Sequence, residues 1–219
     1  METITINIAP GNTISGELYK PAGIPNGGAV VIAYGSDGMK EPWATMIREY
    51  ARELSGKNYS VLIPDYLKST NSAPGPDVFA QIQANLPQWQ SAVDSAITHA
   101  AAPRIALLGF SLGGHLCLRI RHRAMTVVEF FAPEFLELGG IGAPVAASPH
   151  VQIHHGKADM LVPYTNATRI DRFLKSHGTA PELFSYAGAG HGFAGTGPKN
   201  ASARRLAKER TLAFIAKYL

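Results

Sequence analysis

The feature that most limits the fold of this chain is a series of short, largely apolar runs that alternate with segments of helical period. The runs cover residues 29–34, 60–63, 105–108, 126–131, 150–154 and 182–186. A strand that is apolar on both faces is buried on both faces, as in a parallel sheet covered by helices. These runs therefore predict the central strands of such a sheet.

Segments with apolar residues at helical spacing separate the runs. They cover residues 42–56, 77–100, 113–123, 163–176 and 201–218. Alternating strands and helices favour parallel strands with helices on both faces. Residues 3–8 and 14–19 instead alternate with period two around a Pro-Gly-Asn turn, which predicts an antiparallel pair at one edge. We expect a single α/β domain over residues 1–219, with a mostly parallel, twisted sheet of about eight strands.

Composition excludes several classes of protein. The 219 residues can bury a full core without a disulfide or a metal, and 46% hydrophobic against 16% charged residues excludes disorder as the dominant state. No apolar run approaches the ~18 residues that span a bilayer, and residues 1–7 lack the features of a signal peptide. A single cysteine, Cys117, is weak support for a reducing compartment, so we expect a cytoplasmic protein.

Two basic runs, residues 119–123 and 204–208, raise the alternative of a nucleic-acid-binding protein, because phosphate neutralisation needs clustered cations. In both runs the basic residues alternate with apolar residues at helical spacing. We interpret them as solvated helix faces and predict no nucleic-acid partner and no membrane partner. A monomer is the favoured state.

The strongest motif is Gly109-Phe110-Ser111-Leu112-Gly113, which lies directly after an apolar run and directly before a helical segment. This setting is typical of a nucleophile elbow, in which a serine sits on a strained turn at the end of a central strand. The following helix points its first amides at the site, which favours a developing oxyanion. The alternative is a tight turn whose glycines serve packing alone.

A nucleophilic serine needs a base, and the base needs an orienting acid. In elbow architectures these partners follow in the order serine, acid, histidine. Asp159 and His191 each come just after a predicted strand, so both fall on loops at the carboxyl edge of the sheet. Glu134 is a rival acid, which we interpret as a surface carboxylate.

Other histidines offer further candidates. His154 and His155 are neighbours on a predicted strand, so their side chains point to opposite faces, one into the core and one near Asp159. His115 follows Ser111 by one helical turn and is interpreted as a packing residue. No HExxH motif and no workable metal-ligand spacing occur, so we predict no metal and no cofactor.

The predicted oxyanion site needs two amide donors. The first is the amide of Leu112, the residue after the serine, and the second comes from the loop Gly35-Ser36-Asp37-Gly38. We choose the Ser36 amide, with Asp37 as the second choice. Cys117 lies within the helix and is expected to be buried rather than nucleophilic.

Taken together, these motifs resemble the dienelactone hydrolase family of α/β-hydrolases, from Gly27 to the end of the chain. The segments that carry the resemblance are 30–35, 64–66, 109–113, 155–159, 188–193 and 208–212. The resemblance implies the α/β-hydrolase fold and cofactor-free hydrolysis of an ester or lactone. It maps the family's triad onto Ser111, Asp159 and His191.

Three positions differ from the typical family member. Ser111 stands in place of a cysteine, and Gly35 in place of a glutamate that partners that cysteine. These two changes are consistent with each other, because an enzyme with a serine nucleophile has no nucleophilic thiol for the glutamate to partner. Gly195 stands in place of an arginine that grips a substrate carboxylate, which argues against an acidic lactone as substrate.

The sequence therefore predicts a serine carboxylesterase that forms an acyl-enzyme on Ser111. Residues 132–149 leave no room for the lid domain that many hydrolases of this fold insert, so we expect an open pocket for small or short-acyl esters. About half of seven candidate wall residues should contact substrate. They are Trp43, Tyr66, Trp89, Phe110, Phe135, Met160 and Phe193. A non-catalytic small-molecule binding protein, a thioesterase, a polyester depolymerase and a peptidase of the same fold stay open as alternatives.

Overall fold

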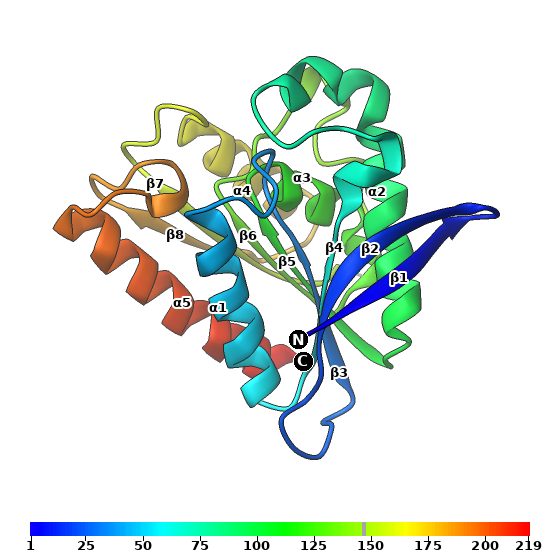
Figure 1. The fold of residues 1–219 in the computed structure, drawn as a ribbon. Helices are drawn as coiled ribbons and strands as arrows, with labels where there is room; N and C mark the ends of the chain where they lie inside the picture. The colour runs from blue at the N-terminus through cyan, green and yellow to red at the C-terminus, as the bar shows by residue number, and fades with distance from the viewer. Residues whose placement is uncertain (146–147) are drawn as a thin grey trace.

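The computed structural model describes residues 1–145 and 148–219. These residues build an eight-stranded sheet in the order β1-β2-β4-β3-β5-β6-β7-β8 (Figure 1). The strands are β1 (Glu2–Ala9), β2 (Asn12–Tyr19), β3 (Gly28–Ala33), β4 (Ser60–Pro64), β5 (Arg104–Phe110), β6 (Thr126–Phe130), β7 (His150–Gly156) and β8 (Glu182–Tyr186). Strands β3 to β8 pair in parallel, and β1 and β2 add an antiparallel edge. The predicted sheet is confirmed.

Helices cover both faces of this sheet. They are α1 (Trp43–Gly56), α2 (Asp77–Ala100), α3 (Leu112–Arg119), α4 (Thr165–Ser176) and α5 (Pro198–Tyr218). Helices α1 and α5 lie side by side on one face, where Lys208 of α5 reaches Glu49 of α1 at 3.7 Å (Figure 1). Helices α2, α3 and α4 cover the other face. The fold is that of an α/β-hydrolase.

The burial pattern explains why these segments form these elements. Every residue of β3 and of β6 is buried, as a strand covered on both faces requires, whereas β1 alternates at the open edge. The buried residues of α1 recur at helical spacing. They are Ala44, Ile47, Tyr50, Ala51 and Leu54.

The segment after Ser111 differs from the sequence expectation. The helix ends at Arg119 instead of 123, and Arg121–Arg123 form a short 3-10 helix. The cause is Arg121, which turns inward and donates to the carbonyl oxygens of Leu118 at 2.8 Å and Ile141 at 2.6 Å. Arg121 is only 2% exposed, so the interpretation of this run as a solvated face is wrong at that position.

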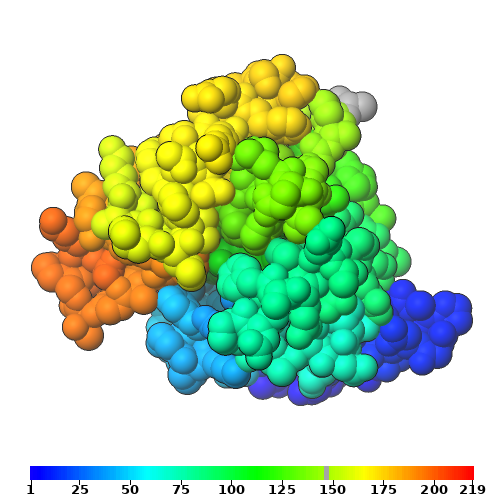
Figure 2. All heavy atoms as spheres, turned by 90° about the horizontal axis from the view of Figure 1, so that it is seen from above, coloured from blue at the N-terminus to red at the C-terminus, as the bar shows by residue number. Residues whose placement is uncertain are grey.

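Parallel strands bring their carboxyl ends to one edge of the sheet, and the loops that leave β3, β5, β6, β7 and β8 meet there. Figure 2 views the molecule from above, onto this edge, where the surface is hollowed between the light-blue, teal, green and yellow segments. In the residues that the structure describes, no helix is both long and apolar enough to cross a membrane.

Candidate active site

Ser111 lies at the sharp turn between β5 and α3. Its φ of 51° and ψ of −119° form a conformation that residues with a side chain rarely adopt. Hydrogen bonds on both sides hold it, since the Ser111 amide donates to the Phe130 carbonyl at 2.8 Å and the Ser111 carbonyl accepts from the His115 amide at 3.1 Å. The structure thus contains the strained strand–turn–helix geometry that the motif predicts.

Two glycines permit this turn. A Cβ on Gly113 would lie 2.1 Å from the carbonyl oxygen of Ala33, and a Cβ on Gly109 would lie 2.5 Å from the carbonyl oxygen of Gly113. Both distances are shorter than any real contact, so the start of α3 lies directly against the backbone of β3. Only glycine lets the two backbones approach this closely.

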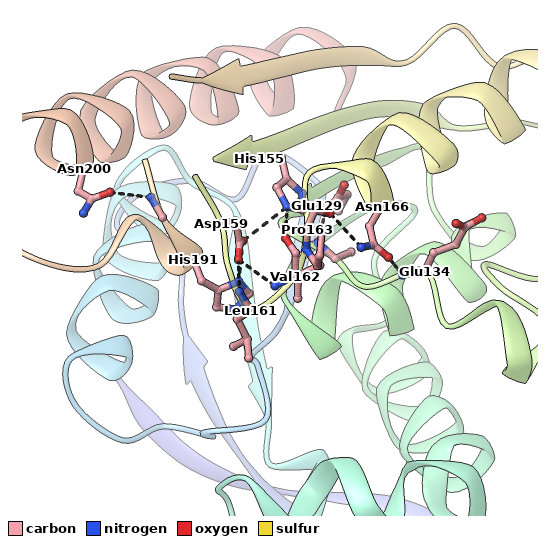
Figure 3. Close-up of polar contacts among 12 residues, drawn as sticks. Glu129, Glu134, His155, Asp159, Leu161, Val162, Pro163, Asn166, His191 and Asn200 are labelled. Atoms are coloured by element: carbon pink, nitrogen blue, oxygen red, sulfur yellow. Dashed lines mark hydrogen bonds and ion pairs between the residues drawn. The ribbon is translucent and has the colours of Figure 1, made fainter. Parts of the chain in front are cut away.

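Asp159 lies on the turn that follows β7, and it is 5% exposed. Its Oδ1 accepts from the amides of Leu161 at 3.0 Å and Val162 at 2.8 Å. Its Oδ2 accepts from Nδ1 of His191 at 2.8 Å (Figure 3). Three donors therefore satisfy the carboxylate and fix its direction, so that it can hold the imidazole in one tautomer.

His191 opens a short 3-10 turn after β8, and that loop is anchored on both sides. The Gly190 amide donates to Oδ1 of Asn200 at 3.0 Å (Figure 3). A Cβ on Gly192 would lie 2.2 Å from the Trp43 ring, so the indole packs directly on the loop backbone. Because Nδ1 of His191 is bonded to Asp159, Nε2 is the ring nitrogen left for chemistry.

Ser111 and His191 line the same hollow at the carboxyl edge of the sheet. It holds about 400 Å³ of empty space, part of it open to solvent. The turn 35–38 and the carboxylate of Asp37 form one side, and apolar side chains form the rest. The apolar lining residues are Trp43, Met46, Ile47, Phe110, Phe131 and Leu161.

The turn 35–38 borders Ser111 closely. The Gly38 amide donates to the Gly35 carbonyl at 3.0 Å, which places Ser36 and Asp37 at the tip of the turn, where both line the hollow. A Cβ on Gly35 would lie 3.3 Å from Cβ of Ser111, so a longer side chain there would crowd the serine. Leu112 is the first residue of α3, and its amide precedes the helical hydrogen-bond ladder.

Only two of the seven predicted wall residues, Trp43 and Phe110, line this hollow. Tyr66 and Trp89 are fully buried and do not line it. The Tyr66 hydroxyl donates to the Tyr34 carbonyl at 2.9 Å, and Nε1 of Trp89 donates to Oγ1 of Thr70 at 2.6 Å. Their polar atoms are satisfied inside the core, so the expectation that they contact substrate is wrong.

The other three also lie away from the hollow. Phe193 is buried behind His191, with its ring centroid 5.6 Å from that of Phe131. Phe135 lines a neighbouring depression, and Met160 is 92% exposed. These placements contradict the prediction. The sequence shows that an aromatic residue lies near the end of a strand, but it does not show whether the side chain faces the core, the solvent or the pocket.

Sequence reasoning missed four lining residues, namely Met46, Ile47, Phe131 and Leu161. Phe131 had a usable signal, since it ends an apolar run at the carboxyl edge. Its φ of 44° turns the chain, and its ring centroid lies 4.7 Å from that of His191. Met46 and Ile47 belong to the helical period of α1 and carry no such signal.

Three further titratable groups near the site, His115, Cys117 and Glu134, are buried. His115 bonds the Pro133 carbonyl through Nδ1 at 3.0 Å, and burial lowers its pKa to about 3. Burial also raises the pKa of the Cys117 thiol, so this cysteine is a poor nucleophile. The rival acid Glu134 is 7% exposed rather than a surface group, but His191 is bonded to Asp159 instead.

No three His, Cys, Asp or Glu side chains gather as a metal site within residues 1–145 and 148–219.

Solved structures share this architecture. Esterase Est2 from Thermogutta terrifontis, bound to propionate, matches 99% of this chain and 93% of its own at a TM-score of 0.75 and 20% identity. A proposed dienelactone hydrolase from Klebsiella pneumoniae subsp. pneumoniae matches 99% of both chains at a TM-score of 0.75 and 18% identity. An alpha-beta serine hydrolase homologue from Coxiella burnetii matches 95% and 96% at a TM-score of 0.69 and 18% identity. At these identities the likeness establishes the fold.

The family follows from the sequence itself. Among curated proteins none matches the chain significantly. The profile of the dienelactone hydrolase family, in contrast, matches residues 14–219, which include the elbow, the acid loop and the histidine loop. With the sheet, the strained serine and the aspartate–histidine pair in place, the chain belongs to the dienelactone hydrolase family and is a hydrolase that acts on ester bonds.

Proposed function

We propose that the protein is a serine carboxylesterase that cleaves small esters through an acyl-enzyme on Ser111. The observation that carries the proposal is the 2.8 Å bond between His191 and Asp159, with His191 and the strained Ser111 lining one hollow. A serine hydroxyl is a weak nucleophile, and an imidazole oriented by a carboxylate is the group that activates it.

The first half-reaction forms the acyl-enzyme. Nε2 of His191 takes the proton of Ser111 as Oγ forms a bond to the ester carbonyl carbon. Asp159 holds the imidazole and stabilises the imidazolium that results. The tetrahedral intermediate then collapses, the alkoxide leaves, and it takes the proton back from His191.

The second half-reaction releases the acid. A water molecule gives its proton to His191 and attacks the acyl carbonyl, after which Oγ of Ser111 leaves and recovers the proton. In both halves the amides of Leu112 and Ser36 stabilise the oxyanion. Each such donor contributes a factor of roughly 10² to 10³ to the rate.

The hollow favours small, neutral acyl groups. Its walls are largely apolar, and the described residues between β6 and β7, 131–145 and 148–149, hold one short 3-10 helix and no lid domain. Two solved forms of the Thermogutta terrifontis esterase carry propionate and butyrate. We therefore expect butyrate esters to be cleaved faster than long-chain esters, measured as kcat/KM on a p-nitrophenyl series; faster turnover of the long-chain esters would contradict this.

Charge should disfavour acidic substrates. Among the described residues that line the hollow, Asp37 is the one acidic side chain, and no lysine or arginine accompanies it. An ester that carries a carboxylate meets repulsion there. A neutral ester should react about five times faster than its carboxylated analogue, and Asp37→Asn, which keeps an oxygen for Nε1 of Trp43, should reduce that ratio.

Substitution of the nucleophile tests the proposal directly. Ser111→Ala should abolish hydrolysis of p-nitrophenyl butyrate while the far-ultraviolet circular dichroism and the thermal midpoint stay close to those of the wild type. Activity that persists within tenfold of the wild type would contradict the proposed role of Ser111.

A further inference from the structure

A second histidine lies against the carboxylate of Asp159. His155 is the penultimate residue of β7 and is 0% exposed. Its Nε2 lies 2.8 Å from the carbonyl oxygen of Val162 and 3.5 Å from Oδ2 of Asp159 (Figure 3). Burial lowers the pKa of His155, so the ring is neutral and the bond to Val162 places its proton on Nε2.

This contact closes a ring of interactions around the acid. Nε2 of His155 donates to the Val162 carbonyl, and the Val162 amide donates to Oδ1 of Asp159 at 2.8 Å. The other carboxylate oxygen, Oδ2, faces both Nε2 of His155 and Nδ1 of His191. The imidazole therefore holds Val162 by its carbonyl oxygen, while the amide of the same residue holds Asp159. The imidazole also presents the positive end of its N–H dipole to the same carboxylate.

Other titratable groups contribute less to this cluster. The Tyr164 ring meets the edge of His155 with centroids 5.8 Å apart. Glu129 on the neighbouring strand β6 is fully buried, and its carboxyl accepts from the Ala132 amide at 2.9 Å. In the described part of the chain Nδ1 of His155 has no hydrogen-bond partner. The polar contacts of the ring are therefore those of Nε2.

We propose that His155 is a positioning residue, which holds the turn 159–162 so that Asp159 meets His191 in the catalytic orientation. The inference rests on the proposed function. Without the donor at Nε2, the Val162 carbonyl loses its partner and the backbone at Val162 is less constrained. The Asp159–His191 bond then weakens, and the imidazolium of His191 is less stabilised. The residue acts on the reaction through Asp159 and His191 and does not touch the substrate.

Three substitutions of His155 separate the effect of the hydrogen-bond donor at Nε2 from the effect of side-chain volume. His155→Phe fills the space without a donor, and kcat should fall about 20-fold with KM within twofold. Gln places an amide nitrogen near the former Nε2 position, so His155→Gln should keep kcat within about threefold of the wild type. The shorter Asn places its amide nitrogen only near the former Nδ1 position, so His155→Asn should lose more than about threefold in kcat. The Asn–Gln comparison remains decisive if the Phe variant fails to fold.

The pH profile supplies a readout that a packing role does not move. The acidic limb of kcat/KM reports the pKa of the free enzyme's base, which is His191 in this account. In His155→Asn and His155→Phe this limb should move down by about half a pH unit, because His191 loses stabilisation of its charged form. An unchanged or raised limb would overturn the proposal.

His154 provides the matched control. It is the adjacent residue, equally buried, but it bonds Tyr186 and Gln152 at 2.8 Å each, away from Asp159. His154→Phe should lower the thermal midpoint yet leave kcat and the acidic limb unchanged. If His155→Phe behaves like His154→Phe while wild-type esterase activity is normal, the positioning role is refuted and the proposed function stands.

Discussion

Single residues decide whether the elbow can form. Gly113 shows this most clearly, since its missing side chain is what lets α3 start against the carbonyl oxygen of Ala33. The motif predicted the strained turn at Ser111, because a strand and a helix with clear apolar periods flank it. The pocket walls had no comparable signal, since the direction of a side chain such as Tyr66 depends on tertiary packing.

The first prediction concerns this close approach. Gly113→Ala should lower the free energy of unfolding by about 3 kcal/mol or more, because a Cβ would lie 2.1 Å from a backbone oxygen that cannot move. Gly56→Ala is the control, since a Cβ there meets nothing within 4 Å, and stability should change by less than about 1 kcal/mol. Urea titration of both variants measures the difference; equal effects would contradict the account.

The second prediction concerns the proposed acid. Asp159→Asn keeps the shape of the side chain but removes the charge that orients and stabilises the His191 imidazolium. We expect kcat to fall by a factor of roughly 10⁴ with little change in KM. Steady-state kinetics on p-nitrophenyl butyrate measures this; a loss below tenfold would show that another group, such as Glu134, serves as the acid.

At the scale of elements, the chain between β6 and β7 is held by arginines that the sequence places in a basic run. Arg119 donates to the carbonyl oxygens of Leu138 at 3.1 Å and Gly140 at 2.9 Å, and Arg121 bonds Ile141 and Ala143. Their apolar neighbours suggested a solvated helix face. Charge and spacing do not tell whether a guanidinium finds carbonyl oxygens inside the molecule, so sequence reasoning could not have found this contact.

The third prediction follows from that contact. Arg121→Met removes the donors of several buried carbonyl groups and should lower the free energy of unfolding by about 3 kcal/mol. Arg123→Met is the control, since its ion pair with Asp94 at 3.2 Å is part-exposed and contributes less than about 1 kcal/mol. Chemical denaturation of both variants checks this. If the two variants lose equal stability, Arg121 does not anchor residues 141–143.

At the scale of the whole molecule, the apolar runs predicted the parallel strands, because each run requires burial on both faces, and the period-two segments predicted the antiparallel edge. The order in which the strands pair was not predicted from the sequence. Because the strands are parallel, their carboxyl ends lie at one edge of the sheet. Loops that are far apart in the sequence therefore meet at that edge. A single domain over residues 1–219 and a cytoplasmic location stay predictions.

The fourth prediction concerns stability against pH. Burial lowers the pKa values of His115 and His154 from 6.5 to about 3, so stability falls as pH drops below 6.5, where the unfolded chain takes up protons that the folded one refuses. Burial raises the pKa of Glu129 from 4.5 to about 8, so its contribution falls as pH rises through that range. Below pH 6.5 the effect of the two histidines on stability is larger than the opposite effect of the one glutamate. The free energy of unfolding should therefore reach its maximum near pH 6.5.

Glu129→Gln separates the two effects. It should abolish the decline between pH 6.5 and 8, which amounts to about 2 kcal/mol, and it should steepen the rise between pH 5 and 6.5, because the glutamate no longer offsets one of the two histidines. Free energies of unfolding from urea titrations at pH 5, 6.5 and 8 measure it. A wild-type curve that rises steadily to pH 8 would refute the buried, protonated Glu129.

The central claim is that Ser111 is the nucleophile, and covalent labelling tests it most directly. Paraoxon is a suitable reagent, because an organophosphate reacts covalently with an activated serine hydroxyl. The account predicts one adduct per chain by intact mass, located at Ser111 by peptide mapping, formed in parallel with loss of esterase activity and absent in Ser111→Ala. Full loss of activity with an adduct at another residue, or active enzyme that paraoxon does not modify, would contradict it.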